Sequence, residues 1–184
     1  MKHSKNLKVH GLIGDILRLH WYNDFFRRSK NPKIIGFLGG GLGNFEEDAI
    51  LKSIAKFMEP TDYLILGVEY ISDREDDELI AEYSDKKNKQ FVIGPLLDLA
   101  VLSLSKINWD KSFKFKIKKN YNDVKNSKTI ISEYTYKKSD IMLSYSTKYN
   151  KLSLLKYLKD KGFSIVFEID TFDNRYGNII LKKK

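Results

Sequence analysis

The residues with the clearest capacity for chemistry form a glycine-rich turn, Gly-Gly-Gly-Leu-Gly-Asn, at positions 39–44. The turn follows an apolar run at residues 34–38, which is typical of a buried parallel strand, and precedes a helix expected over residues 46–58. A glycine turn between a strand and a helix holds nucleotides, because the backbone can approach the ligand closely. Glu69 closes the next expected strand and would contact the ribose in such a site.

The same glycines also have a structural interpretation. They do not follow the G-x-G-x-x-G spacing, and Glu69 lies 26 residues after Gly43 rather than the roughly 20 expected. The first helical turn carries three acids that would repel a pyrophosphate: Glu46, Glu47 and Asp48. In this interpretation the glycines permit a tight turn and close packing of the helix on the strand. Both interpretations remain open on these residues alone.

The segments around the turn predict a βαβ unit. Residues 34–38 and 63–68 are expected to be parallel strands, joined in a right-handed connection by the helix that Pro60 ends. Upstream, the pattern predicts a short strand over residues 7–13 and a helix over residues 16–28.

The second half of the chain predicts antiparallel strands and shorter helices. An acidic helix is expected over residues 73–83 and an apolar one over 95–106. Alternating segments predict three strands near residues 113–117, 129–131 and 141–143, followed by a helix over 151–161 that ends at Gly162, and by strands over 163–172 and 178–181. The chain of 184 residues suits one α/β domain.

Charge is distributed in opposing blocks along a chain of net charge +9. Residues 106–161 hold fifteen lysines against five acids, whereas residues 44–85 have a net charge of −10. A basic block favours nucleic acid or another anionic surface, but base recognition favours arginine, which this block lacks, so a solvated lysine face is the alternative. The opposing blocks also allow a self-complementary dimer. The tyrosines available for base stacking are Tyr121, Tyr134, Tyr136, Tyr145 and Tyr149.

Several classes of site and location are excluded or disfavoured. The chain has no cysteine, so it has no disulfide, thiolate metal site or cysteine nucleophile. The only histidines are His3, His10 and His20, which disfavours a zinc site or a Ser-His-Asp triad. We therefore expect no metal and no dedicated catalytic acid or base. No apolar run approaches the roughly 18 residues of a membrane span, so we expect a soluble cytoplasmic protein.

Five motifs occur in the order found in one enzyme family. Residues 37–45 (FLGGGLGNF) resemble the FLG-x-x-x-GN signature of the histidine-specific, S-adenosylmethionine (SAM)-dependent methyltransferases of the ergothioneine type. Residues 64–69 are similar to that family's LLGVD strand, and residues 82–85 to its AYDD segment. Residues 144–149 resemble its E-x-S-x-K-[YF] run, and residues 155–163 its helix ending in Gly-Phe.

The resemblance implies an α/β fold: a partial class I methyltransferase (Rossmann-like) sheet with an added mixed or antiparallel β lobe. Residues 1–184 would form a single domain, Rossmann-like over 7–93 and 141–184, with an inserted lobe over about 94–140. In the family's sheet order, 3-2-1-4-5-7-6, this sequence begins at the third strand. The resemblance therefore implies that the first two strands are missing, together with the primary cofactor loop and the ribose-binding acid.

The resemblance also implies a set of site residues. For the substrate, Asn44 would bind the amino or carboxylate group, Tyr83 would line the amine pocket, and Ser146 would contact the side chain. Ser144 stands at the neighbouring substrate position, where the family has a glutamate that would bind an imidazole, which argues against histidine as the substrate. For the cofactor SAM, the implied contacts are Asp15, which would accept from the adenine amine, and the backbones of Gly39 and Gly41.

We therefore expect a methyltransferase-like protein, related to amino-acid N-methyltransferases, that acts on a small amino-acid-like substrate. It would be incomplete, or would depend on a partner, with weak or absent SAM binding in the isolated chain. The missing strands would be replaced by residues 7–13 moving beside residues 34–38, by a complementing chain, or by a second copy in a homodimer. The alternative is a lysine-rich nucleic-acid-binding or protein-interaction module on a degenerate Rossmann scaffold.

Overall fold

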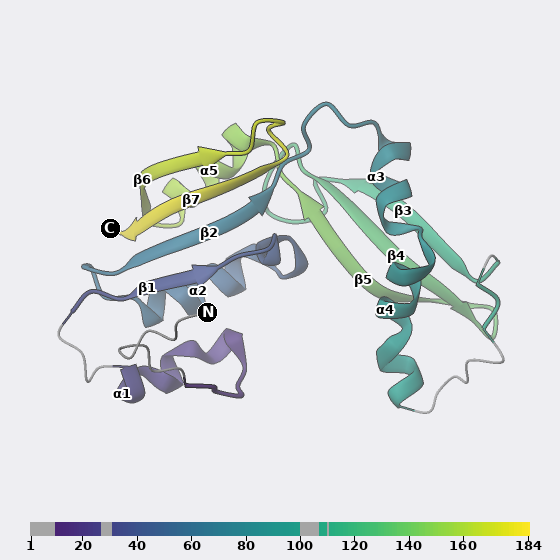
Figure 1. Cartoon of the computed structure of the whole chain (residues 1–184), viewed down its shortest axis with the longest axis horizontal. Coiled ribbons are helices and arrows are strands. Elements are labelled where there is room, and N and C mark those ends of the chain that lie inside the picture. Colours follow the sequence, from purple (N-terminus) through teal and green to yellow (C-terminus); the bar gives the residue numbers. More distant parts are fainter. Residues whose placement is uncertain (1–9, 27–30, 100–106, 110) are drawn as a thin grey trace, which may run out of the picture.

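The computed structural model describes residues 10–26, 31–99, 107–109 and 111–184. Two sheets organise these residues, one with strand order β1-β2-β7-β6 and one with order β3-β4-β5 (Figure 1). Within this described part, no helix has the length and apolar character needed to cross a membrane. The α/β class predicted from the sequence is confirmed.

The four-stranded sheet begins with the predicted βαβ unit. Strand β1 (Ile34–Phe37) pairs in parallel with β2 (Tyr63–Glu69), and α2 (Glu47–Phe57) connects them. Two antiparallel strands, β7 (Tyr176–Lys183) and β6 (Phe163–Asp170), complete the sheet. The order β1-β2-β7-β6 is that of strands 4-5-7-6 in a class I methyltransferase sheet, so this expectation is also confirmed.

The main core lies between this sheet and two helices, α2 and α5 (Lys151–Asp160). Both helices lie on the same side of the sheet in Figure 1. Alternate residues of β2 and β7 are fully buried against them, because side chains along a strand point to opposite faces in turn. The fully buried aliphatic side chains of this core include Leu64, Leu66, Ile179, Leu181, Ile50, Leu154 and Leu158.

The second sheet is antiparallel throughout. It contains β3 (Phe113–Lys119), β4 (Lys128–Tyr136) and β5 (Ser139–Lys148), close to the three predicted segments but longer at their ends. Helices α3 (Asp76–Tyr83) and α4 (Lys86–Asp98) lie beside this sheet (Figure 1). Of these two helices, α4 contributes to a separate small core that includes Ile93, Phe113 and Tyr134.

The segment predicted as a helix over residues 95–106 is helical over residues 95–98, but its helix begins nine residues earlier than predicted. Helix α4 begins at Lys86 and ends at Asp98, and residues 100–106 lie outside the described residues. The helix begins at Lys86 because the Asp85 carboxylate accepts a hydrogen bond from the Asn88 N–H at 2.7 Å, which is a standard N-cap. Pro95 therefore lies near the end of the helix rather than at its start.

The N-terminal prediction is also corrected in part. Residues 7–9 lie outside the described residues, and residues 10–13 belong to no strand, so they do not pair with β1. Residues 16–26 are helical, but as a 3-10 helix η1 (Ile16–Tyr22), kinked at Arg18, followed by the short α1 (Asn23–Phe26). Among the strands the structure describes, β1 therefore has β2 as its single neighbour.

The two sheets meet where β5 reaches the end of β2. Tyr149, just after β5, donates its N–H to the Glu69 carbonyl and accepts from the Ile71 N–H, each at 3.0 Å. Its buried phenol also donates to Glu47 at 3.0 Å. This junction fixes the last residues of β5 against the carboxyl end of β2.

Candidate functional site

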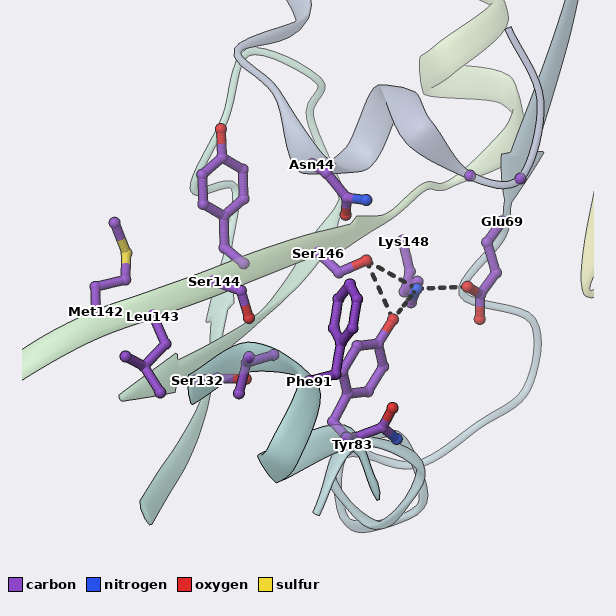
Figure 2. Close-up of a pocket in the computed structure, with 15 residues that line it drawn as sticks. Asn44, Glu69, Tyr83, Phe91, Ser132, Met142, Leu143, Ser144, Ser146 and Lys148 are labelled. Carbon is purple, nitrogen blue, oxygen red and sulfur yellow. Dashed lines mark hydrogen bonds and ion pairs between the residues drawn. The ribbon is translucent and has the colours of Figure 1, made fainter. Parts of the chain in front are cut away.

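A cavity of about 520 Å³ lies beside this junction (Figure 2). Its walls come from the turn after β1, the end of β2, helices α3 and α4, and strands β4 and β5. Ligand sites in α/β proteins form at the carboxyl ends of parallel strands, and β1 and β2 end here. The position is therefore one that the fold would use for a ligand.

The cavity brings together most of the residues that the sequence motifs singled out. Gly39, Asn44, Tyr83, Ser144 and Ser146 all line it, although they come from three separate segments: the glycine turn, α3 and β5. Figure 2 shows Asn44 above the strand that carries the two serines, with Tyr83 on the opposite wall. Their roles in binding remain predictions, but their convergence on one cavity is a structural fact.

The glycine turn combines the two roles considered from the sequence: some of its glycines border open space where a ligand could approach, and another permits close packing. Gly39 and Gly40 have φ near +75° and +73°, and a Cβ at either position would meet nothing within 4 Å, so their backbone borders open space. Gly43 instead touches β5, because a Cβ there would lie 2.4 Å from the Thr147 carbonyl oxygen. This contact seats the 3-10 helix η2 (Gly41–Asn44) on β5 and places Asn44 at the cavity.

Two of the predicted cofactor contacts lie elsewhere. Gly41 begins η2 and does not line the cavity; a Cβ there would lie 3.1 Å from the Phe37 ring. Asp15 caps η1, where it accepts from the Leu17 N–H at 2.9 Å and lies 3.5 Å from the Arg18 guanidinium. The structure therefore gives Asp15 a capping role, and its contact with adenine remains a prediction.

A buried lysine that the sequence analysis did not assign is central to the cavity wall. Lys148 is only 2% exposed, and its ammonium donates to the Tyr83 hydroxyl at 2.6 Å and to Ser146 Oγ at 3.1 Å. It also forms an ion pair with Glu69 (Figure 2). The alternation of side chains along a strand could have indicated Lys148 from the sequence, because it places residues 144, 146 and 148 on one face of β5.

Glu69 is held within the protein rather than free to bind a ribose. Its carboxylate binds Lys148 and also the Arg74 guanidinium, at 2.9 Å. Arg74 in turn pairs with Glu82 at 2.9 Å and donates to the Tyr70 carbonyl at 2.6 Å. A buried carboxylate needs such partners, and with them it fixes Lys148 in place.

The rest of the cavity wall is neutral and partly apolar. Phe91 and Val92 come from α4, and Met142 and Leu143 from β5. A bulge places Leu143 between the residues of β5 that pair with β4, so the strand turns both Leu143 and Ser144 toward the cavity. Among the described residues, no group of three or more His, Asp or Glu side chains is placed to hold a metal ion.

The lysine-rich block is partly neutralised within the fold. Two of the tyrosines considered for base stacking, Tyr134 and Tyr149, are 3% and 1% exposed, so their rings are unavailable to nucleic acid. Six lysines of the block pair with carboxylates: Lys114, Lys116, Lys128, Lys148, Lys151 and Lys161. The buried tyrosines and these ion pairs favour the interpretation of the block as a solvated lysine face.

The sequence matches, over residues 1–183, the family described as histidine-specific, SAM-dependent methyltransferases. The chain belongs to this family. The match extends the motif resemblance to nearly the whole chain and agrees with the sheet order and with the position of the cavity. No curated protein matches the sequence.

Several solved structures are similar to this member of the family, and two of the three described here are named methyltransferases. A SAM-dependent methyltransferase from Clostridium acetobutylicum ATCC 824 is 13% identical, with 97% of this chain and 66% of that chain covered and a TM-score of 0.42. The PH0226 protein from Pyrococcus horikoshii OT3 is 12% identical, with coverages of 82% and 54% and a TM-score of 0.43. The glycopeptide N-methyltransferase MtfA in complex with SAM is 7% identical, with coverages of 93% and 59% and a TM-score of 0.42. The chain thus spans 54–66% of the length of these proteins.

Proposed function

We propose that this chain binds an α-amino acid in the cavity and directs its amino group toward the methyl group of SAM. The observation that carries the proposal is the convergence of Gly39, Asn44, Tyr83, Ser144 and Ser146 on one cavity in a member of this methyltransferase family. The amide of Asn44 offers both a donor and an acceptor, which suits a carboxylate or an amine. Tyr83 would line the amine pocket.

The turn at Gly39 and Gly40 fits the close approach of SAM. Both backbones border the cavity, and open space surrounds the position of each absent Cβ. SAM, when bound, supplies a methyl group on a positively charged sulfur. The chain would contribute mainly by holding the amine in line with that methyl group, since correct orientation alone can supply much of a rate enhancement. Consistent with this, the charged lining residues, Glu69 and Lys148, are paired with each other.

The proposed acceptor is an α-amino acid with a neutral side chain. Ser144 stands on the wall where the family resemblance places a glutamate, and the neighbouring lining residues Phe91, Leu143 and Ser132 carry no charge. A pocket with hydroxyls and apolar surface suits a small neutral side chain better than an imidazolium or an ammonium.

We further propose that the SAM site is completed by a protein strand alongside β1, from a second copy or a complementing chain. Among the described strands, β1 pairs only with β2; Ile34, its first residue, is 71% exposed and Leu38, just after it, is 59% exposed. An open edge of this kind is a template for pairing. Binding of nucleic acid by the lysine-rich block has less support, because two of the tyrosines considered for base stacking are buried.

The proposal is tested by titrating the chain with S-adenosylhomocysteine and amino acids in a calorimeter, and by following transfer of a labelled methyl group. In Tyr83→Phe, we expect amino-acid binding or turnover to fall about three- to tenfold, the effect of one hydrogen bond. The matched control is Tyr121→Phe, whose hydroxyl lies outside this cavity. Equal losses in both variants, or binding of SAM with no amino-acid binding, would contradict the proposed substrate site.

A further inference from the structure

The hydrogen bonds around Ser146 restrict what its hydroxyl can do. A serine hydroxyl has two lone pairs that accept and one proton that donates. Ser146 Oγ accepts from the Lys148 ammonium at 3.1 Å and from the Tyr83 hydroxyl at 3.1 Å. Both lone pairs are therefore occupied, and the proton remains to be donated.

The other members of the cluster cannot exchange these roles freely. The Lys148 ammonium has three N–H groups, and these point at Glu69, Tyr83 and Ser146, as the dashed lines in Figure 2 show. An ammonium has no lone pair, so it cannot accept from either hydroxyl. Tyr83 accepts from Lys148 and donates its proton to Ser146. The remaining proton of the cluster is that of Ser146, which lines the cavity.

The cluster is also held rigidly enough for this restriction to persist. Lys148 is 2% exposed and Glu69 is 9% exposed, so water does not readily replace their partners. The second oxygen of Glu69 binds Arg74 at 2.9 Å, and the Glu69 carbonyl accepts from the Tyr149 N–H in the junction between the sheets. Lys148 therefore cannot swing away without breaking a buried ion pair.

We infer that Lys148 is a positioning and specificity-determining residue that makes Ser146 a hydrogen-bond donor toward the cavity. The inference rests on the proposed function: the amino-acid side chain that meets Ser146 presents a neutral acceptor, such as an amide or carbonyl oxygen. A side chain that can only donate, such as an ammonium, meets a second donor there and is rejected. Specificity of this kind comes from leaving one donor without an acceptor.

The binding test compares three ligands of similar size on the full chain: asparagine, leucine and 2,4-diaminobutyrate. In the wild type, we expect asparagine to bind most tightly and diaminobutyrate most weakly. Ser146→Ala should weaken asparagine about three- to tenfold and leave leucine within about twofold, the scale of one neutral hydrogen bond. Ser146→Thr keeps the hydroxyl and should retain the preference. Equal weakening of all three ligands in Ser146→Ala would overturn the inference.

The role of Lys148 is tested with the double variant Glu69→Gln/Lys148→Met, which leaves no unpaired carboxylate beside the cavity. With a lone pair of Ser146 released, diaminobutyrate should gain about three- to tenfold relative to asparagine. A purely structural role would weaken both ligands in the same ratio, and that result would overturn the inference.

A neutron map of deuterated crystals tests the hydroxyl orientation without any ligand. We expect a deuteron on Ser146 Oγ directed into the cavity and three on Lys148 Nζ. A Ser146 deuteron directed at Tyr83 would overturn the inference, whatever the protein's activity. If no amino acid bound while the map showed the expected orientation, the proposed function would fail and the donor role of Ser146 would stand.

Discussion

Asp62 shows how one buried carboxylate holds the start of the parallel sheet. It accepts from the Lys33 N–H at 2.8 Å and the Glu59 N–H at 2.7 Å, and pairs with the Lys33 ammonium at 2.8 Å. Burial alone would raise the pKa of Asp62, but the hydrogen bonds from Lys33 and Glu59 outweigh it and lower the pKa below 3.8. At neutral pH, Asp62→Asn should lower the free energy of unfolding by about 2 kcal/mol, measured by urea unfolding.

The pH dependence of the stability lost in Asp62→Asn follows from the direction in which folding shifts the pKa of Asp62. Because the native pKa is lower than the unfolded one, the unfolded chain takes up the proton first. The stabilisation from Asp62 is complete above about pH 5 and is lost as the pH falls through 3.8 and then the native pKa. The difference between wild type and Asp62→Asn should therefore narrow on acidification. A difference that stays constant between neutral pH and pH 3 would contradict this account.

At the scale of elements, substitution of two glycines by alanine should change the free energy of unfolding by different amounts. Gly43→Ala would place a Cβ 2.4 Å from the Thr147 carbonyl oxygen, so η2 must move away from β5, at a cost of about 1–3 kcal/mol. Its control is Gly94→Ala in α4, where a Cβ meets nothing within 4 Å beyond its chain neighbours; the gain in helix propensity is offset by the contact of that Cβ with the Pro95 ring, so the free energy of unfolding should change by less than about 0.5 kcal/mol. Thermal unfolding measures both. Equal effects would show that the contact of η2 with β5 does not constrain the backbone.

The sequence predicts correctly those helices and strands that are determined by residues within or next to them. The strands β1 and β2 and the helix α2 follow from apolar periodicity and from Pro60, and they appear as expected. Helix α4 begins at Lys86 rather than at the predicted Pro95, because Asp85 caps its first turn and the sequence analysis did not use that capping residue. Five of the site residues were found through motifs. The cluster around Lys148 was not, because it depends on a junction between segments 79 residues apart.

At the scale of the molecule, the open edge of β1 should govern assembly. If a second copy completes the SAM site, the mass in solution and the affinity for S-adenosylhomocysteine should rise together with protein concentration. Ile34→Lys should abolish both and change the free energy of unfolding by less than about 0.5 kcal/mol, because Ile34 is 71% exposed. Sedimentation and calorimetry measure the two effects. A wild-type monomer that binds the ligand tightly would contradict the need for a partner strand.

The junction between the sheets also constrains how this protein can change over evolution. Lys148 donates to the Tyr83 and Ser146 hydroxyls and also forms an ion pair with Glu69 beside the junction, so we expect a substitution of Lys148 alone to change ligand preference and folding stability together. Lineages that acquire a new substrate are expected to vary first at Ser144, Phe91 or Met142, which line the cavity without belonging to the charged network. Lys148 and Glu69 should change only as a pair, or through an intermediate protected by stabilising substitutions elsewhere.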